Sequence, residues 1–529
     1  MLSSKICLII LDGWGIGRED FTNAIYQAQT PYIEEIKKFY PMTTLQASGI
    51  AVGLPFSEPG NSEVGHLTLG TGQILYQYPV RISQSISNKT FFHNPAFELV
   101  INHTIQNHSA LHLIGLFSSA VVHSSYEHLL ALIDLARQHN LPRVYLHLFT
   151  DGRDSSPYAA KELLPQLLTD LKDRGAGQLA SIAGRFYGMD RDKNYDRTRK
   201  VYDAIVQGKG TIIKDPILYL EYNYKKGITD EFIPPALVGD PQDPHSVKLI
   251  QDNDGLIFFN FREERMRQLV EPFVFPEFNK FPIKRFSNLK IATMTQYHKS
   301  FPTAVAFPPQ KITTCLAKVL SEYKKRQLHL AESEKYAHVT YFFDGLKEKP
   351  YPGEFWVIVP SVKTLHLEDY PELAAPQISQ RLLQAFEEGV YDFILVNYAN
   401  GDLIGHTGDI EAGKEAAEVI DKQLAKVVPT GMEQGYTFLI TADHGNLERM
   451  ANPFTGEKET SHDTSLVPFY FVDKRFRLPQ PRTKAQIKSI ERESGGMLAD
   501  VSPTILTLFG LPVPREMTGQ SLLPLLGIF

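Results

Sequence analysis

The sequence predicts an α/β protein with open sheets and helices on both sheet faces. Short apolar runs bounded by Gly, Asp or Pro alternate along the chain with longer segments of mixed polarity. Such runs are typical of buried parallel strands, and the segments between them of crossover helices. Polar and charged residues follow several of these runs directly. Because ligands bind at the carboxyl ends of strands in open α/β sheets, these residues are the candidate site.

The predicted elements are as follows, in chain order. Strands are expected at residues 6–11, 111–116, 144–150, 256–261, 393–397 and 437–441. Helices are expected at residues 125–139 and 411–428. Asp409 stands just before the second helix, where a short carboxylate side chain is favoured as the N-cap.

Two kinds of chemistry at the strand ends predict two domains. Carboxylates and imidazoles follow the first strand and the last two, whereas arginines follow the strands in the middle of the chain. We therefore expect residues 1–76 and 311–529 to form one domain. Residues 77–310 would form a second domain, inserted into the first.

Composition excludes several classes of function. The chain has 529 residues and a formal net charge of -6, which gives no general attraction for nucleic acid or anionic membrane. The apolar run at residues 6–11 is too short for a signal-peptide core, and no run reaches the roughly 20 residues of a membrane span. Cys7 and Cys315 are too few for a disulfide framework. These features predict a soluble protein of the cytoplasm, and any bound anion requires a local cluster of positive charge.

One set of side chains is typical of a catalytic divalent-metal site. Carboxylate and imidazole together suit Mn²⁺ or Zn²⁺, and less exclusively Mg²⁺. Singly, such residues more often cap helices or fill cores, but here three strand-end segments supply them. Around Asp402 and His406, a curling loop and a helical turn are both compatible with the spacing. The candidate ligands are Asp12, Asp402, His406, Asp443, His444 and His462.

Ser62 is the candidate nucleophile. It lies between Gly60 and Gly65, which leave the backbone around it open, and a bound metal would lower the pKa of its hydroxyl. The alternative is an ordinary turn with Ser62 as a helix N-cap. Two nucleotide motifs fail: Arg18 replaces the third glycine of a dinucleotide loop, and His66 replaces the lysine of a P-loop.

A cluster of positive charge is found in the middle of the chain. Arginine binds phosphate and carboxylate through two parallel hydrogen bonds, so several arginines suit a small molecule that carries both groups. Asp154 could move a proton on a substrate hydroxyl, or hold Arg153 by a salt bridge. His123 could bind substrate or satisfy a loop. The basic residues are Arg153, Arg185, Arg191, Arg262 and Arg265, with Lys335 further along.

Taken together, the chain resembles cofactor-independent phosphoglycerate mutases over essentially its whole length. The metal motifs alone would indicate only the wider alkaline-phosphatase-like superfamily, and the arginine motifs narrow the resemblance. The motifs lie at residues 11–15 (Leu-Asp-Gly-Trp-Gly), 60–66 (Gly-Asn-Ser-Glu-Val-Gly-His), 151–154, 184–191, 260–265, 334–340 and 441–446.

The resemblance implies an alkaline-phosphatase-like, three-layer metal-binding domain with an inserted α/β phosphotransferase domain. It implies that Asp12, Ser62, Asp443 and His444 hold one metal, and that Asp402, His406 and His462 hold the other. It implies phosphoglycerate as substrate, bound by His123, Arg153, Asp154, Arg185, Arg191, Arg262, Arg265 and Lys335. Two divalent ions are expected, usually Mn²⁺, with Mg²⁺, Co²⁺ or Zn²⁺ as alternatives. No 2,3-bisphosphoglycerate, nucleic acid or membrane partner is expected, and the chain would be a monomer.

The function that follows is interconversion of 3- and 2-phosphoglycerate through a phosphorylated Ser62, with Asp154 and Lys335 assisting. The alternative is a metal-dependent phosphatase or another phosphomutase of the same superfamily. A phospholigand sensor without activity would be favoured if a metal ligand were missing, but all seven are present. The chain departs from the family pattern at Gly401, where Pro is expected, and at Asp463. Asp463 could orient His462 or compete for metal.

Overall fold

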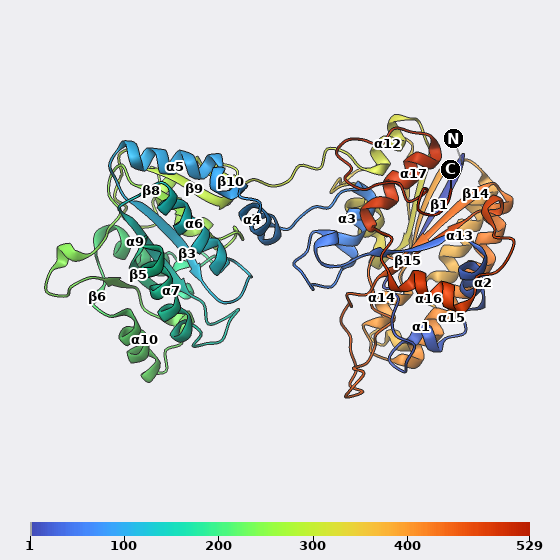
Figure 1. Ribbon diagram of the computed structural model, residues 1–529, viewed down its shortest axis with the longest axis horizontal. Helices are drawn as coiled ribbons and strands as arrows, with labels where there is room; N and C mark the ends of the chain where they lie inside the picture. The colour runs from blue at the N-terminus through green and yellow to red at the C-terminus, as the bar shows by residue number, and fades with distance from the viewer. Residues whose placement is uncertain (1–2, 529) are drawn as a thin grey trace. The chain divides into compact units, whose positions relative to one another are not determined.

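A computed structural model describes residues 3–528 of the chain (Figure 1). The chain divides into two compact units. The first combines both ends of the sequence, Met1–Gln77 and Lys311–Phe529. The second is the continuous segment Tyr78–Gln310. Within residues 3–528, no helix has both the length and the apolar character needed to cross a membrane.

The first unit is built on an eight-stranded mixed sheet. The strand order is β12-β11-β13-β1-β14-β15-β2-β16. From β12 to β14 neighbouring strands are parallel, and β15 is antiparallel to both of its neighbours. The strands are β1 (Lys5–Leu11), β2 (Met42–Gln46), β11 (Gln327–Glu332), β12 (Glu354–Val359), β13 (Phe393–Tyr398), β14 (Tyr436–Thr441), β15 (Val467–Val472) and β16 (Gly496–Met497).

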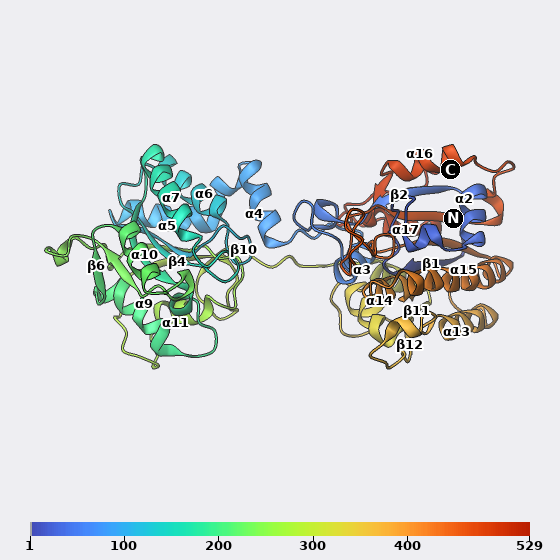
Figure 2. The same cartoon turned by 90° about the horizontal axis from the view of Figure 1, so that it is seen from below.

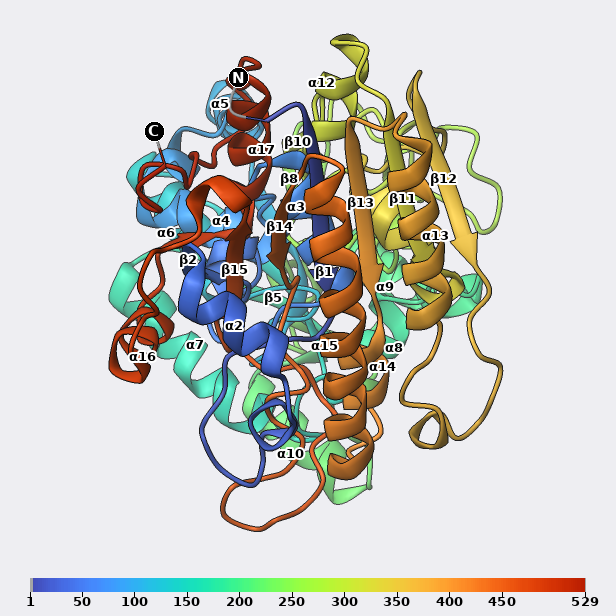
Figure 3. The same cartoon turned by 90° about the vertical axis from the view of Figure 1, so that its right-hand side faces the viewer.

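Strand β1 is buried on both of its faces. Residues 6–10 are fully buried, although successive side chains of a strand point to opposite faces. A strand with two apolar faces needs cover on both sides. Helices α2, α13 and α15 lie in front of the strands in Figure 3, and α16 packs against β2, at the opposite edge from β12 (Figure 2). The predicted α/β class is confirmed.

Helix α15 is longer than the sequence predicts. It begins after Asp409, whose side chain accepts the N–H of Ala412 as an N-cap, but it continues five residues beyond the predicted end and through Pro429. Val427, Val428 and Gly431 are buried, and Gly431 lies against the ring of Phe438, so the last turns pack on the sheet although Pro429 removes one hydrogen bond. The helices of this unit are α1 (Ala24–Gln27), α2 (Pro31–Phe39), α3 (Ser62–Thr71), α12 (Leu316–Glu322), α13 (Ala375–Glu388), α14 (Asn400–Gly405), α15 (Ile410–Glu433), α16 (Lys484–Arg492) and α17 (Val501–Phe509).

The second unit has its own eight-stranded sheet and its own core. The strand order is β10-β9-β8-β3-β4-β5-β7-β6, and only the β5–β7 pair is antiparallel. The strands are β3 (Leu111–Phe117), β4 (Val144–Thr150), β5 (Gln178–Gly184), β6 (Thr211–Ile213), β7 (Ala236–Val238), β8 (Gly255–Phe258), β9 (Lys290–Thr295) and β10 (Ala304–Phe307).

Strand β8 ends at Phe258 and is shorter than predicted, because the chain leaves the ladder after the N–H of Phe259 donates to the carbonyl of Ile114. The N–H of Phe261 instead donates to the carbonyl of His123, in the loop that follows β3. The predicted helix at residues 125–139 corresponds to α6 together with its N-cap and C-cap residues. The helices are α4 (Tyr78–Ser87), α5 (Pro95–Gln106), α6 (Tyr126–Gln138), α7 (Ala160–Arg174), α8 (Arg185–Gly188), α9 (Tyr195–Gln207), α10 (Pro216–Lys225) and α11 (Arg267–Val274).

Candidate active site

Three neighbouring strands of the first unit bring Asp12, Asp402, Asp443 and His444 together. Strands β13, β1 and β14 are adjacent and parallel, so their carboxyl ends meet at one edge of the sheet. Asp12 follows β1 directly, Asp443 follows β14 after one residue, and Asp402 lies in α14, just beyond β13. All four side chains are buried. Three carboxylates buried so close together require positive charge nearby.

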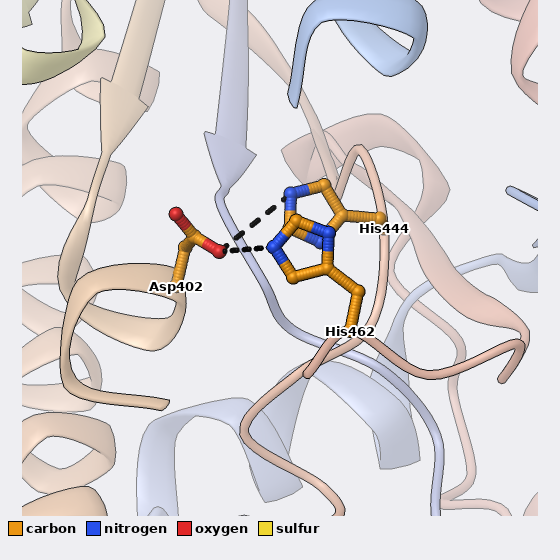
Figure 4. Close-up of side chains that lie close together, drawn as sticks. All are labelled: Asp402, His444 and His462. Atoms are coloured by element: carbon orange, nitrogen blue, oxygen red, sulfur yellow. Dashed lines mark hydrogen bonds and ion pairs between the residues drawn. The ribbon is translucent and has the colours of Figure 1, made fainter. Parts of the chain in front are cut away.

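Asp402 is the centre of one group of ligand atoms. The stretch around it is helical, and His406 is the C-cap residue of α14, one helical turn after Asp402. Asp402 Oδ1 is 3.2 Å from His406 Nε2 and 2.9 Å from His462 Nε2. In Figure 4 the rings of His444 and His462 both approach this carboxylate, with His444 Nε2 at 3.8 Å. The interpretation of the segment around Asp402 and His406 as a curling loop is therefore wrong.

Ser62 is the first residue of α3, and its hydroxyl faces the carboxylates. The N-cap is Asn61, whose side chain accepts the N–H of Val64, so the interpretation of Ser62 as N-cap is wrong. Ser62 Oγ lies 3.1 Å from Asp12 Oδ1 and 3.0 Å from His444 Nε2. The helix start thus presents the hydroxyl to two candidate metal ligands.

The ammonium group of Lys335 lies at the centre of this constellation. The residue is only 3% exposed and follows β11 in a short 3₁₀ turn. Its Nζ is 2.8 Å from Asp12 Oδ1, 2.6 Å from Asp402 Oδ2 and 2.7 Å from Ser62 Oγ. The ammonium group therefore contacts the candidate nucleophile and two of the buried carboxylates.

Protonation states follow from these contacts. Burial, the largest single influence, would raise the pKa values of Asp12 and Asp402. The charge of Lys335 together with hydrogen bonds from neighbouring histidines outweighs burial and holds both pKa values well below their ordinary value. Burial alone would lower the pKa of His444, but the carboxylates of Asp443, Asp402 and Asp12 raise it to about 9. The site is thus rich in ionised carboxylate oxygens.

The donor set fits divalent metal ions. Within residues 3–528, ligand atoms of Asp12, Asp443 and His444 lie within 4.8 Å of one another, as do those of Asp402, His444 and His462. Asp443 Oδ2 is buried and accepts no hydrogen bond of good geometry, so it has a lone pair available for a cation. Carboxylate oxygen with imidazole nitrogen is the chemistry that Mn²⁺ and Zn²⁺ accept. His444 belongs to both groups.

The Asp463 carboxylate pairs with residues other than His462. Its carboxylate accepts hydrogen bonds from Ser465 and from Arg449, 3.0 Å away. His462 Nδ1 is instead 2.8 Å from the carbonyl oxygen of Gly60, which fixes the ring and directs Nε2 toward Asp402. The orienting role considered for Asp463 is therefore wrong, and competition of Asp463 for metal stays a hypothesis.

In the second unit, the predicted binding residues gather at the carboxyl ends of β3, β4, β5 and β8. His123 lies in the loop after β3, Arg153 and Asp154 follow β4, and Arg185 follows β5. These strands are neighbours in the sheet, with β8 beside β3. Arg262 and Arg265 follow β8 and Arg191 follows α8. The structure therefore brings segments far apart in the sequence to a single edge.

Asp154 pairs with Arg185 and not with Arg153. Arg185 Nη1 is 2.6 Å from Asp151 Oδ1 and also bonds Asp154, and it is almost fully buried. Arg153 is instead 3.6 Å from Glu231. The alternative role considered for Asp154, a salt bridge to Arg153, is therefore wrong, because β5 places a more buried arginine beside that carboxylate.

The arginines lie close enough to repel one another. Burial, followed by repulsion from Arg185, Arg191 and Arg153, lowers the pKa of Arg265. Burial and repulsion from Arg185 also lower the pKa of His123, to about 4, so this imidazole is neutral. Arg191 has Glu264 3.9 Å away as its carboxylate neighbour. An anion with more than one negative charge would relieve this repulsion.

Two residues near the ligands were not predicted as part of the site. Asn446 donates through its side chain to Asp402 Oδ1, at 3.2 Å. Glu448 is 1% exposed, and its Oε2 accepts the N–H groups of Gly15 and Asn446, so it joins the loop after β1 to the loop after β14. Burial raises the pKa of Glu448 to about 7. Their place just after Asp443-His444 is the only signal that the sequence gives.

Comparison with known proteins identifies the family. Residues 82–299 match the family described as "BPG-independent PGAM N-terminus". The chain is 44% identical over 520 residues to the 2,3-bisphosphoglycerate-independent phosphoglycerate mutase of Thermomicrobium roseum, with 98% of each chain covered. The enzyme of the same name from Chloroflexus aggregans is 43% identical over 539 residues, again with 98% of each covered.

The fold is similar to that of a solved relative. Crystal structures of Leishmania mexicana phosphoglycerate mutase at low cobalt concentration match with a TM-score of 0.51 and 27% sequence identity. The match covers 98% of this chain and 97% of that one. The resemblance inferred from the motifs is confirmed: this chain belongs to the 2,3-bisphosphoglycerate-independent phosphoglycerate mutase family.

Proposed function

We propose that this chain interconverts 3-phosphoglycerate and 2-phosphoglycerate through a phosphorylated Ser62, without 2,3-bisphosphoglycerate. The observation that carries the proposal is the position of Ser62 Oγ, within 3.1 Å of Asp12, His444 and Lys335. The relatives aligned over nearly the whole chain are 2,3-bisphosphoglycerate-independent phosphoglycerate mutases, which supports the same reaction.

Two divalent ions complete the proposed site, and Mn²⁺ is the ion we expect. One would be held by Asp12, Ser62, Asp443 and His444, the other by Asp402, His406 and His462. Bound there, such ions supply Lewis acidity and lower the pKa of a coordinated hydroxyl. The solved Leishmania relative was crystallised at low cobalt concentration, which supports a divalent metal without selecting one.

Residues of the first unit form the phosphoserine. Ser62 Oγ, deprotonated before the attack, bonds to phosphorus as the bond between phosphorus and the C3 oxygen breaks, and the return step releases it again without a proton. Lys335 Nζ, 2.7 Å from Ser62 Oγ, offsets negative charge on the nucleophile and then on the phosphoryl oxygens. In the return step the C2 oxygen bonds to phosphorus and the bond to Ser62 Oγ breaks.

Residues of the second unit hold the glycerate and move its proton. Asp154 gives a proton to the C3 oxygen in the first step and takes one from the C2 hydroxyl in the second, so protons balance over a turnover. Arg185 fixes Asp154 through their ion pair. The remaining arginines and His123 bind the carboxylate and phosphate, which prevents loss of glycerate between steps.

The test is turnover of 3-phosphoglycerate by Mn²⁺-loaded protein in the absence of 2,3-bisphosphoglycerate. Formation of 2-phosphoglycerate with little free phosphate, lost on chelation, is the expected result. Release of phosphate alone would instead indicate the metal-dependent phosphatase, and turnover of other phosphate esters another phosphomutase. Ser62→Ala should abolish isomerisation while Mn²⁺ still binds, and appreciable residual turnover would exclude the phosphoserine.

We also infer a monomer that works in the cytoplasm, on the strength of the family resemblance. Light scattering should then give a particle of 59.7 kDa. A particle of twice that mass would contradict the monomer and leave the proposed reaction unaffected.

A further inference from the structure

His66 lies one helical turn after Ser62 and is fully buried beside two candidate metal ligands. Its Nδ1 is 2.9 Å from the carbonyl oxygen of Ser62 and 3.1 Å from Asp443 Oδ2. Its Nε2 is 3.0 Å from Asn397 Nδ2, which is also 2.7 Å from Asp12 Oδ2. The imidazole therefore occupies the space between the nucleophile's helix and the Asp12 and Asp443 carboxylates.

The chemistry of these contacts permits one arrangement of hydrogens. The two N–H groups of Asn397 donate to Asp12 Oδ2 and to His66 Nε2, which must therefore be the unprotonated ring nitrogen. His66 Nδ1 then carries the proton and donates it to the Ser62 carbonyl, with Asp443 Oδ2 as a second, less aligned acceptor. The hydrogen bonds therefore run outward from the Asn397 amide, to Asp12 on one side and through His66 to the Ser62 carbonyl on the other, with Asp443 Oδ2 3.1 Å from His66 Nδ1.

We propose that His66 and Asn397 are positioning residues, which hold Asp12 and Asp443 in the orientation needed to bind one of the two divalent ions. The inference rests on the proposed function, because it assumes that these carboxylates are metal ligands. Without such contacts a carboxylate can rotate, and loss of outer contacts of this kind costs about 10–100-fold in metal affinity.

A core-filling role for His66 makes a different prediction. If the ring merely occupies volume between α3 and the sheet, leucine should serve as well, and metal affinity should not change. The polar contacts predict the opposite, since leucine leaves the Asn397 amide without its acceptor and Asp443 without its neighbouring N–H. Metal affinity therefore separates the two roles, whether or not the chain isomerises phosphoglycerate.

The experiment is a Mn²⁺ titration of the metal-free full-length chain, with free ion followed by electron paramagnetic resonance. The variants are His66→Leu, His66→Asn and His66→Gln. Asn retains an N–H near the Nδ1 position, and Gln retains an acceptor near Nε2, so each variant keeps one of the two hydrogen bonds of the imidazole. Phe471 is fully buried in β15 of the same unit, and Phe471→Leu is the control for a general loss of core packing. Tryptophan fluorescence checks that each variant folds.

We expect His66→Leu to weaken one of the two ions by about 10–100-fold and to leave the other near its wild-type affinity. His66→Asn and His66→Gln should each produce part of that loss, so the result does not depend on the leucine variant folding. Wild-type binding by all three variants, or an equal loss in Phe471→Leu, would overturn the inference. If the unmodified chain binds fewer than two ions, the proposed metal centre itself fails, and this inference fails with it.

Discussion

Replacing Lys335 with methionine should destabilise the metal-free first unit strongly and the metal-loaded unit much less. Methionine keeps most of the length and volume of the side chain and removes only the charge. In the metal-free chain, the Asp12 and Asp402 carboxylates, both in contact with Lys335 Nζ, would then lose their buried counter-charge. Two divalent cations would supply that charge again.

The size of the effect follows from burial. Lys335 is 3% exposed and the two carboxylates are 0% and 4% exposed, so solvent screens these ion pairs little. Removing one partner of a buried pair costs about 3–5 kcal/mol, chiefly because the remaining charge is left uncompensated. We expect a loss of that size in the free energy of unfolding when EDTA is present.

The assay uses the two tryptophans of the chain, Trp14 and Trp356, which both belong to the first unit. Their fluorescence during urea unfolding therefore reports on that unit and not on the second. We would compare the wild type with Lys335→Met in EDTA and in saturating Mn²⁺. The difference in the free energy of unfolding between the two proteins should be smaller in Mn²⁺ than in EDTA by at least half, which is roughly 2 kcal/mol or more. The reason is that the ions bind only the folded state.

A difference that is equally large with and without Mn²⁺ would refute the reasoning. It would mean that bound ions do not compensate the carboxylates that Lys335 compensates. Lys318→Met, at a partly exposed lysine of the same unit, is a matched control and should change stability by less than about 1 kcal/mol.

Three further predictions concern other parts of the molecule. Glu448→Ala should weaken Mn²⁺ binding about 10–100-fold, whereas Glu448→Gln, whose carbonyl can accept the same N–H groups, should bind almost normally in a calorimetric titration. Burial lowers the pKa of His128 from 6.5 to about 4, so stability should fall as the pH drops below about 6.5, with about 2 kcal/mol lost at pH 5. In scanning calorimetry, His128→Gln should not show this part of the stability loss at acidic pH. The same pH dependence of stability in wild type and variant would contradict the prediction. A Cβ on Gly70 would lie 2.0 Å from the carbonyl oxygen of Phe343, so Gly70→Ala should cost about 1–3 kcal/mol in urea unfolding, unlike Gly210→Ala, which meets no atom within 3.4 Å.

Much of the fold could be predicted because strands buried on both faces have continuous apolar sequences. The runs that became β1, β3 and β4 agree with the structure to within a residue. Errors arose where long-range contacts override local preference. Helix α15 continues through Pro429, and its last turns pack on the sheet through Val427, Val428 and Gly431, whereas β8 ends early and Phe261 bonds the loop after β3.

The candidate ligands could be chosen from sequence because their residue types are rare in combination and stand at strand ends. The ion-pair and hydrogen-bond partners of these residues could not be predicted in this way. The sequence neighbours of Asp154 and His462 suggested salt bridges and orienting carboxylates that the structure replaces with Arg185 and the Gly60 carbonyl. A side chain pairs with what lies nearest in space, and neighbours along the chain often point elsewhere.

The sequence by itself determined the α/β class, the family, and which carboxylates, imidazoles and arginines could do chemistry. Only the tertiary structure decided how they combine. It placed Lys335 among Asp12, Ser62 and Asp402, and it inserted His66 between two carboxylates. The physical reason is that residue type and period are local properties, whereas the distances that set charge compensation depend on the packing of strands hundreds of residues apart.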